Sequence, residues 1–468
     1  MKRTGKTKTW QPDYLYTGGR FVSGWTLTAD ADGRITRVGP AQRGGTVIHL
    51  PNRALLPGLI NAHSHAFQRV LRGRTETRTH AQDSFWTWRE QMYHAAVSLS
   101  PEDVYAASRM AFLEMALSGI TTVGEFHYLH HAPDGAPYAD PNELAKQVIR
   151  AAQDVGLRIC LLRVAYARAG HNLAPNPRQA RFIEQNPETY IKHTEQLRAA
   201  LPAARCPLPA VWLGVAPHSV RAVPLDYLKE VTAWAAQHDL PVHSHVAEQP
   251  AEIAACVAEY GRAPLELWAT EGLLNERFTG VHGIHVNARE IKALAGSGAS
   301  ICVCPTTERN LGDGIAPVDK YFAAGVNLSL GTDSQAQIDL LEDARELEYH
   351  LRLQTQERAV LAPGGGDASA LAARLLACAT VNGARSLGFD GGLLDVGRPA
   401  DFFTVDLSDP AIAGATPETL LANTVFTLNR AAVRDVFVGG RVIVSDRQHS
   451  QQAATITQFS DLQQRLWA

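Results

Sequence analysis

The first residues of this chain that could carry out chemistry are two histidines at the end of an apolar run. Residues 56–65 read LPGLINAHSH, and the apolar part predicts a strand that ends in His63-Ser64-His65. Because side chains alternate between the two faces of a strand, His63 and His65 point to the same side. Two imidazoles placed in this way begin a metal site, and its other ligands must come from elsewhere in the chain.

Seven further apolar runs resemble the one near Ile60, and they cover residues 119–123, 158–164, 211–215, 240–243, 279–281, 299–303 and 326–330. Helical stretches separate several of them. One begins at Ser100-Pro101-Glu102-Asp103, which combines an N-cap, proline at the first helical position and an acid at the third, and it ends at Gly119. Eight strands separated by helices predict a closed (β/α)₈ TIM barrel. A doubly wound open sheet is the alternative, although no Gly-x-Gly-x-x-Gly follows the first strand.

In such a barrel the chemistry lies where the strands end and the following loops begin. Polar residues capable of binding a metal or moving a proton stand at most of these ends. They are Glu125, His127 and Tyr128 after the second strand, His218 and Arg221 after the fourth, His245 and Glu248 after the fifth, His282 after the sixth and Asp333 after the eighth. We therefore expect them to converge at one end of the barrel.

The residue types indicate a hydrolytic metal centre. His63, His65, His245 and Asp333 would provide three nitrogens and one oxygen, a set suited to one Zn²⁺ with a water in the open position. Zn²⁺ lowers the pKa of its bound water to about 7, which produces a metal-bound hydroxide at neutral pH.

The neighbouring side chains have roles in the same reaction. Glu248 would carry a proton from the water to a leaving nitrogen. His282 would polarise the group under attack or hold the water, and Asp333 would accept a proton besides binding the metal. No lysine lies at a predicted catalytic strand end to bridge a second ion. The predicted reaction is hydrolysis at a trigonal carbon with one divalent metal per chain.

Both ends of the chain differ from this middle. Short strand-like segments with turns fill the first fifty residues and recur after residue 400, where Gly439-Gly440 predicts a two-residue hairpin. We expect a small β-sandwich domain assembled from residues 1–57 and 394–468, with the barrel formed by residues 58–393.

Composition excludes several classes of function. The net charge of −3 gives no reason to expect nucleic acid or an anionic membrane as partner, and no apolar run is long enough to span a bilayer. The basic start, residues 2–8, is followed by no apolar segment and is interpreted as a solvated terminus. The cysteines are predicted to be buried, reduced thiols of a cytoplasmic protein. They are Cys160, Cys206, Cys256, Cys302, Cys304 and Cys378.

The order of these motifs resembles the amidohydrolase superfamily over nearly the whole chain. The segments that carry the resemblance are residues 57–65, 245–248 and 331–333, together with His282 and the GRPADF sequence at 397–402. The resemblance implies the barrel, the composite β domain and a homodimer, which is also the commonest assembly on general grounds.

Within the superfamily the chain is similar to the N-formimino-L-glutamate deiminase branch, through residues 63–69, 85–93, 121–130, 216–223 and 305–308. This similarity implies hydrolysis of a formimino C=N to N-formyl-L-glutamate with release of ammonia. It further implies substrate contacts from Gln68, Arg89, Tyr128, His218 and Arg221. Arginine suits the two carboxylates of such a substrate, although the sequence does not assign either arginine to either carboxylate.

Several alternatives stay open at this point. A deaminase of a purine, cytosine or triazine ring would use the same metal centre, and a catalytically silent member of the superfamily is a second rival. Trp86 and Trp88 could line a pocket or pack a loop against the barrel. Gln335, where histidine is expected, and the bulky Arg309 put details of substrate contact in doubt.

Overall fold

The computed structural model describes residues 7–42, 46–76, 85–201, 210–365 and 367–468. At its centre, eight parallel strands pair in chain order, and an isolated parallel bridge between Ser64 and Asp333 joins the last strand to the first. The strands are β6 (Leu59–Ser64), β7 (Ile120–His127), β8 (Arg158–Ala165), β9 (Val211–Pro217), β10 (Val242–Val246), β11 (Phe278–His282), β12 (Ser300–Val303) and β13 (Asn327–Leu330). Each coincides with a predicted run, so the predicted barrel is confirmed.

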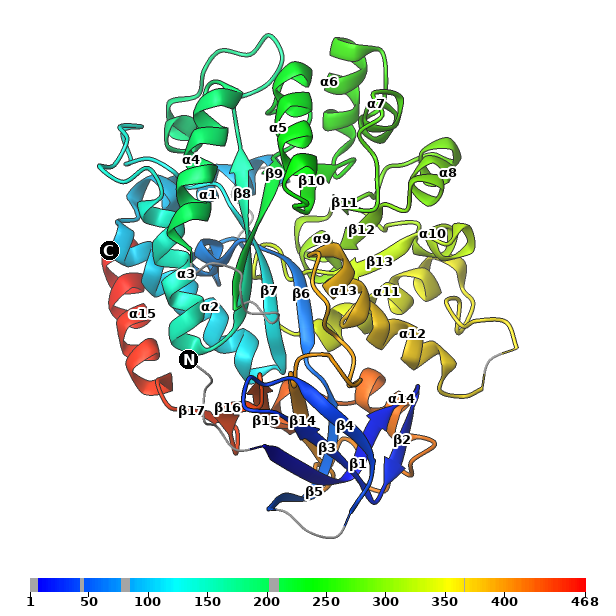
Figure 1. The fold of residues 1–468 in the computed structure, drawn as a ribbon. Helices are drawn as coiled ribbons and strands as arrows, with labels where there is room; N and C mark the ends of the chain where they lie inside the picture. The colour runs from blue at the N-terminus through cyan, green and yellow to red at the C-terminus, as the bar shows by residue number, and fades with distance from the viewer. Residues whose placement is uncertain (1–6, 43–45, 77–84, 202–209, 366) are drawn as a thin grey trace.

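Helices surround this barrel (Figure 1). They include α2 (Pro101–Leu117), α3 (Glu143–Val155), α4 (Pro187–Ala200), α5 (Leu225–Gln237), α6 (Pro250–Tyr260), α7 (Pro264–Thr270), α8 (Ala288–Ser297), α9 (Pro305–Leu311), α10 (Val318–Ala324) and α11 (Leu340–Thr355). The predicted start of α2 is confirmed, because Ser100 and Asp103 each accept a hydrogen bond from the backbone N–H of the other. Gly119 follows the helix with a φ of 88°, a conformation that glycine adopts without strain.

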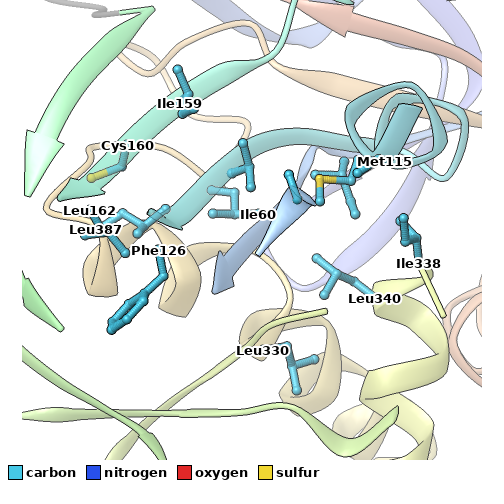
Figure 2. Packing of buried hydrophobic residues seen from close by; sticks show 14 of the residues in the cluster. Ile60, Met115, Phe126, Ile159, Cys160, Leu162, Leu330, Ile338, Leu340 and Leu387 are labelled. Atoms are coloured by element: carbon cyan, nitrogen blue, oxygen red, sulfur yellow. The ribbon is translucent and has the colours of Figure 1, made fainter. Parts of the chain in front are cut away.

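Side chains of the strands and the surrounding helices form one apolar core (Figure 2). Ile60, Phe126 and Leu330 from the strands meet Leu340 from α11 and Leu387, which follows α13 (Val381–Ser386). The five cysteines among the described residues are free and buried, as predicted, and Cys206 lies outside the described residues. So do residues 2–6 of the basic start. None of the described helices is both long and apolar enough to cross a membrane.

Strands from both ends of the chain form a second, mixed sheet, so the predicted β domain built from both termini is present (Figure 1). The strands are β1 (Lys8–Thr17), β2 (Arg20–Ser23), β3 (Trp25–Ala29), β4 (Ile35–Pro40), β5 (Val47–Pro57), β14 (Phe402–Asp406), β15 (Val433–Val438), β16 (Arg441–Ser445) and β17 (Gln448–His449). β5 pairs parallel with β1 and antiparallel with β14, which joins the two halves. Trp10 packs against Phe402 and Phe437 in a core to which both halves contribute. The hairpin at Gly439-Gly440 is present, with φ values of 55° and 67°.

Two contacts tie the ends of the chain to the barrel. The Arg158 guanidinium on β8 donates to the Asp401 carboxylate at 2.6 Å, and both side chains are buried. The C-terminal helix α15 (Gln452–Leu466) packs beside α2, and its Gln463 side chain donates to the Val70 carbonyl at 2.9 Å. Val70 belongs to η1 (Ala66–Leu71), the short helix that directly follows His65. The C-terminal helix therefore supports a segment that begins at the predicted metal site.

Candidate active site

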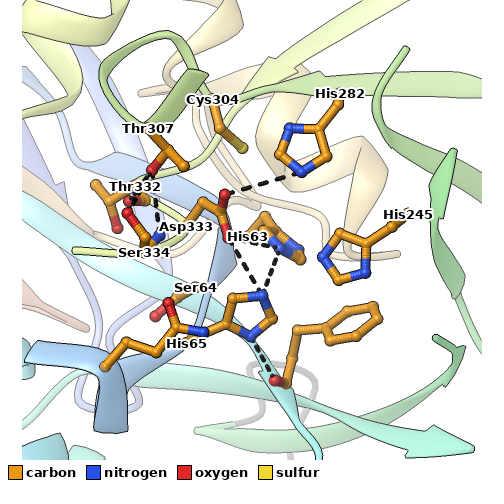
Figure 3. Close-up of polar contacts among 12 residues, drawn as sticks. His63, Ser64, His65, His245, His282, Cys304, Thr307, Thr332, Asp333 and Ser334 are labelled. Atoms are coloured by element: carbon orange, nitrogen blue, oxygen red, sulfur yellow. Dashed lines mark hydrogen bonds and ion pairs between the residues drawn. The ribbon is translucent and has the colours of Figure 1, made fainter. Parts of the chain in front are cut away.

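The four predicted metal ligands meet at the carboxyl-terminal end of the barrel (Figure 3). His63 lies on β6, His65 follows it, His245 lies on β10, and Asp333 follows β13. Asp333 Oδ1 is 3.3 Å from His63 Nε2 and 3.2 Å from His65 Nε2, and the His63 and His245 ring centroids are 5.0 Å apart. All four side chains are buried and offer ligand atoms within 4.8 Å of one another. The structure thus brings together every ligand that the sequence proposed.

Hydrogen bonds behind the cluster orient two of its imidazoles. His65 Nδ1 lies 2.9 Å from the Phe126 carbonyl oxygen, and His245 Nδ1 lies 3.0 Å from the His218 carbonyl oxygen. A carbonyl only accepts, so each Nδ1 carries the hydrogen and each Nε2 keeps a lone pair for the cluster. Three imidazoles and one carboxylate match the ligands that zinc prefers, so the residues present fit a single zinc ion.

The electrostatics of the cluster favour ligation. Burial lowers the pKa of His63 to about 3, and burial together with the neighbouring histidines holds the pKa of His245 well below its usual range. Burial opposes ionisation of Asp333, but hydrogen bonds from His63 and His65 outweigh it and keep the pKa of that carboxyl well below its usual value. The His63 and His245 imidazoles are therefore neutral and the Asp333 carboxyl is ionised at neutral pH, which are the protonation states that metal binding requires.

His282 and Glu248 lie side by side next to the cluster. Glu248 Oε1 is 3.7 Å from His282 Nε2, and Asp333 Oδ2 is 3.8 Å from the same nitrogen. On the other side of the ring, Glu308 Oε1 lies 3.1 Å from His282 Nδ1. Burial lowers the pKa of His282, but Glu248 and Glu308 outweigh it and raise that pKa well above its usual value, while burial raises the pKa of Glu248. Two titratable groups with shifted pKa values therefore lie next to the metal ligands.

The backbone of this end is held in conformations that most residues avoid. Ala247, His282 and Asp333 have φ values of 53°, 75° and 43°, in the left-handed region that favours glycine. Such residues cluster at functional sites, where the surrounding structure has to impose them. Glu252 accepts hydrogen bonds from the backbone N–H groups of Ala247 and Glu248, at 3.2 and 3.1 Å, and so fixes the turn that presents Glu248.

A cavity opens from the cluster, and all five predicted substrate residues line it. They are Gln68, Arg89, Tyr128, His218 and Arg221. Gln68 Nε2 donates to the Tyr128 hydroxyl at 2.8 Å, and burial holds the pKa of His218 well below its usual range. The structure gathers these residues at one site, and their contacts with a substrate remain a prediction.

The two arginines stand out because neither makes an ion pair within 4.0 Å among the described residues. The Nε and Nη1 atoms of Arg89 are buried and have no hydrogen-bond partner in the described part of the chain. The Arg89 guanidinium instead lies 4.4 Å from the centre of the Trp86 ring. Buried polar groups are usually satisfied, so an unpaired guanidinium in a cavity indicates a missing anionic partner.

The sequence analysis did not assign Tyr93 and Tyr166 to the cavity that they line, although two sequence features could have indicated them. Arg89 and Tyr93 are four residues apart on α1 (Phe85–Ser98), and Trp86 lies one turn before Arg89, so helical periodicity puts all three on one face. Tyr166 directly follows β8, the third strand end, which the sequence analysis passed over. Trp86 and Trp88 both line the cavity, and Trp88 also packs against the apolar core, so both interpretations apply to Trp88.

The two residues that departed from the family pattern lie away from the cavity. Gln335 is buried behind the cluster, where its Nε2 donates to the Ser64 hydroxyl at 2.9 Å. Arg309 is exposed and turns outward to the carboxylate of Glu346 at 2.5 Å and to the side chain of Gln337. Neither lines the cavity, so neither disturbs the metal end of the site.

Comparisons with known proteins agree with this geometry. The model of the amidohydrolase family matches residues 54–443. A formimidoylglutamate deiminase from Pseudomonas aeruginosa is 40% identical over 431 residues, which cover 92% of this chain and 93% of that protein. The crystal structure of an amidohydrolase from Brucella melitensis superposes with a TM-score of 0.90 at 34% identity, covering 98% of this chain and all of that one. An adenosine deaminase from Xanthomonas campestris with bound zinc superposes with a TM-score of 0.82 at 25% identity, over 99% of both chains.

Proposed function

Because the chain belongs to the amidohydrolase family, we propose that it hydrolyses N-formimino-L-glutamate to N-formyl-L-glutamate and ammonia, with one zinc ion per chain. The observation that carries this proposal is the pair of arginines, Arg89 and Arg221, which line the same cavity as the metal cluster and make no ion pair among the described residues. N-formimino-L-glutamate carries two carboxylates and a hydrolysable C=N bond, so it matches both ends of that cavity. The 40% identical deiminase supports the same substrate.

Each residue has a defined task in this reaction. Zinc held by His63, His65, His245 and Asp333 would supply Lewis-acid activation of a water molecule. Glu248 accepts a proton as the oxygen of that water forms a bond to the formimino carbon, and it passes the proton to the imino nitrogen. His282, held by Glu308 on its other nitrogen, stabilises the charge that develops. Asp333 would take the remaining proton from the oxygen that came from the water and deliver it to the same nitrogen. The C–N bond then breaks, ammonia leaves, and the oxygen stays as the formyl C=O.

A deaminase of a purine, cytosine or triazine ring is the second candidate. Aromatic side chains favour it, because Trp86, Tyr93 and Phe182 line the cavity, and the zinc-containing adenosine deaminase shares the fold at 25% identity. The two guanidinium groups argue against it, because neither has an ion pair among the described residues and a flat neutral ring would leave both without an anion. Dependence of turnover on the substrate carboxylates separates the two candidates.

The test is ammonia release from N-formimino-L-glutamate by protein of measured zinc content, with mass spectrometry of the product. We expect ammonia and N-formyl-L-glutamate in equal amounts, and turnover that is lost on chelation and restored by zinc. A zinc-loaded protein that leaves this substrate unchanged but deaminates adenosine, cytosine or a triazine would replace the proposal with the second candidate.

A further inference from the structure

Two tyrosines and one glutamine form a hydrogen-bonded group at the arginine end of the cavity. Tyr93 comes from α1, Tyr166 from the residue after β8, and Gln179 from η2 (Pro177–Phe182). Gln179 Nε2 lies 2.6 Å from the Tyr93 hydroxyl and 2.8 Å from the Tyr166 hydroxyl. All three residues are at most 2% exposed. Three separate elements thus meet at one amide nitrogen.

Both tyrosine hydroxyls of this group have a hydrogen that they do not donate to Gln179. The amide nitrogen has two hydrogens, and it donates one to each hydroxyl oxygen. Each hydroxyl therefore acts as an acceptor towards Gln179 and still has its own hydrogen to donate. Burial raises the pKa of Tyr93, so its hydroxyl keeps that hydrogen at neutral pH. Among the described residues, no hydrogen bond donated by either hydroxyl is present.

The charges around the group point to an anion. Arg221 interacts with the Tyr166 hydroxyl, and the Arg89 guanidinium lies 5.5 Å from the centre of the Tyr93 ring. The carboxyl group that influences Arg221 most is that of Glu252, which is already engaged by the two backbone N–H groups of Ala247 and Glu248. Two guanidinium groups and two free hydroxyl hydrogens therefore face a cavity in which no carboxylate of the described residues forms an ion pair with them.

We propose that Tyr93 and Tyr166 donate their hydroxyl hydrogens to a substrate carboxylate, and that Gln179 is the positioning residue that keeps both hydrogens free for it. The inference rests on the proposed function for the identity of the substrate, but the anion pocket itself can be tested without turnover. A hydrogen bond to a charged group contributes roughly 1.5–3 kcal/mol, which corresponds to about a tenfold to hundredfold effect on affinity.

The sharpest variant is Gln179→Glu, which preserves the shape and can only accept hydrogen bonds when ionised. It would draw both hydroxyl hydrogens away from the cavity and place a negative charge beside the arginines. We expect kcat/KM for N-formimino-L-glutamate to fall at least tenfold, with zinc content unchanged. If the amide instead accepted from both hydroxyls, Gln179→Glu would preserve those bonds, and an unchanged kcat/KM would overturn the proposal.

Substrate analogues separate this role from a folding defect. The two mono-amides of N-formimino-L-glutamate each lack one carboxylate. We expect Tyr93→Phe, Tyr166→Phe and Gln179→Glu to lower kcat/KM for the full substrate, and to have little effect on the one mono-amide that lacks the carboxylate held by the tyrosines. Equal losses on all three substrates would overturn the assignment. Tyr105→Phe is the matched control, because its hydroxyl donates to Asp154 outside the cavity.

Calorimetric titration with glutarate distinguishes failure of this inference from failure of the proposed function. We expect glutarate to bind the zinc-loaded wild type and to bind Gln179→Glu at least tenfold more weakly, whether or not N-formimino-L-glutamate is hydrolysed. If glutarate binding depends on Gln179 but the protein releases no ammonia from N-formimino-L-glutamate, the carboxylate pocket is supported and the proposed substrate is wrong. Glutarate affinity that is equal in the two proteins, or absent from both, would overturn the pocket.

Discussion

The two ends of the cavity are formed by different kinds of structural element. At the metal end, strand termini supply the ligands, and backbone carbonyls fix the imidazoles of His65 and His245. At the arginine end, α1, η2 and a strand-end loop supply the side chains, and the buried nitrogens of Arg89 have no partner among the described residues. At the metal end, hydrogen bonds from the protein already orient the ligands. At the arginine end, the positive charges of Arg89 and Arg221 have no ion-pairing anion among the described residues. Metal binding and substrate recognition should therefore respond to different mutations.

The largest expected effect is at the metal end. His245→Ala removes one of four ligands from a buried cluster, and we expect zinc content and turnover both to fall to background. The matched control is His243→Ala, two residues earlier on the same strand, which should retain zinc. Elemental analysis of both variants after gel filtration provides the measurement. A His245→Ala protein that binds zinc as the wild type does would show that the cluster is not the metal site.

The second largest effect distinguishes proton transfer from metal binding at the metal end of the cavity. Glu248→Gln should retain zinc and lower kcat by about 10²–10⁴-fold, because it removes a proton carrier and spares the ligands. Steady-state kinetics with parallel zinc analysis measures this. Wild-type turnover at full zinc loading would remove Glu248 from the mechanism.

At the arginine end, Arg89→Ala and Arg221→Ala should each lower kcat/KM by roughly tenfold to hundredfold, mainly through KM, because each removes a charged partner of a carboxylate. Zinc content should not change. Arg309→Ala is the control, since its guanidinium lies outside the cavity and pairs with Glu346. If both cavity variants had the same kcat/KM as Arg309→Ala, the arginine end of the cavity would not be the carboxylate-binding site.

The smallest effect concerns stability and pH. Burial lowers the pKa of His243 to about 4, against about 6.5 in an unfolded chain. Between these values the unfolded chain binds more protons, so acidification should reduce the free energy of unfolding by up to about 1.4 kcal/mol per pH unit from this residue alone. Above the unfolded value the contribution is constant. Denaturant titrations of metal-free protein between these pH values should give a free energy of unfolding that depends less on pH in His243→Gln than in the wild type. Identical slopes in the two proteins would contradict a lowered pKa of His243.

The sequence predicted the metal end more completely than the arginine end, for a physical reason. Strand alternation and the convergence of parallel strand ends are general rules, so His63, His65, His245 and Asp333 could be placed together from spacing alone. Tyr93, Tyr166 and Gln179 meet only because α1 and η2 fold over the barrel at a particular angle, which no local pattern specifies. The bulk of Arg309 indicated a possible obstruction, but the sequence did not reveal that the side chain turns outward. The parallel pairing of β1 with β5 was also beyond local patterns, because it depends on long-range register.

The junction between β5 and β14 has a consequence for how the protein is made. Pro57 pairs with Phe402 across this junction, so the ribosome synthesises the whole barrel between the two strands. At roughly 5–20 residues per second, β5 waits on the order of 20–70 s for its partner. During that interval the edge of β5 that will pair with β14 is open, and open strand edges invite pairing with other chains. The junction that unites the two ends of the chain therefore leaves one edge of β5 open to aggregation in newly made protein.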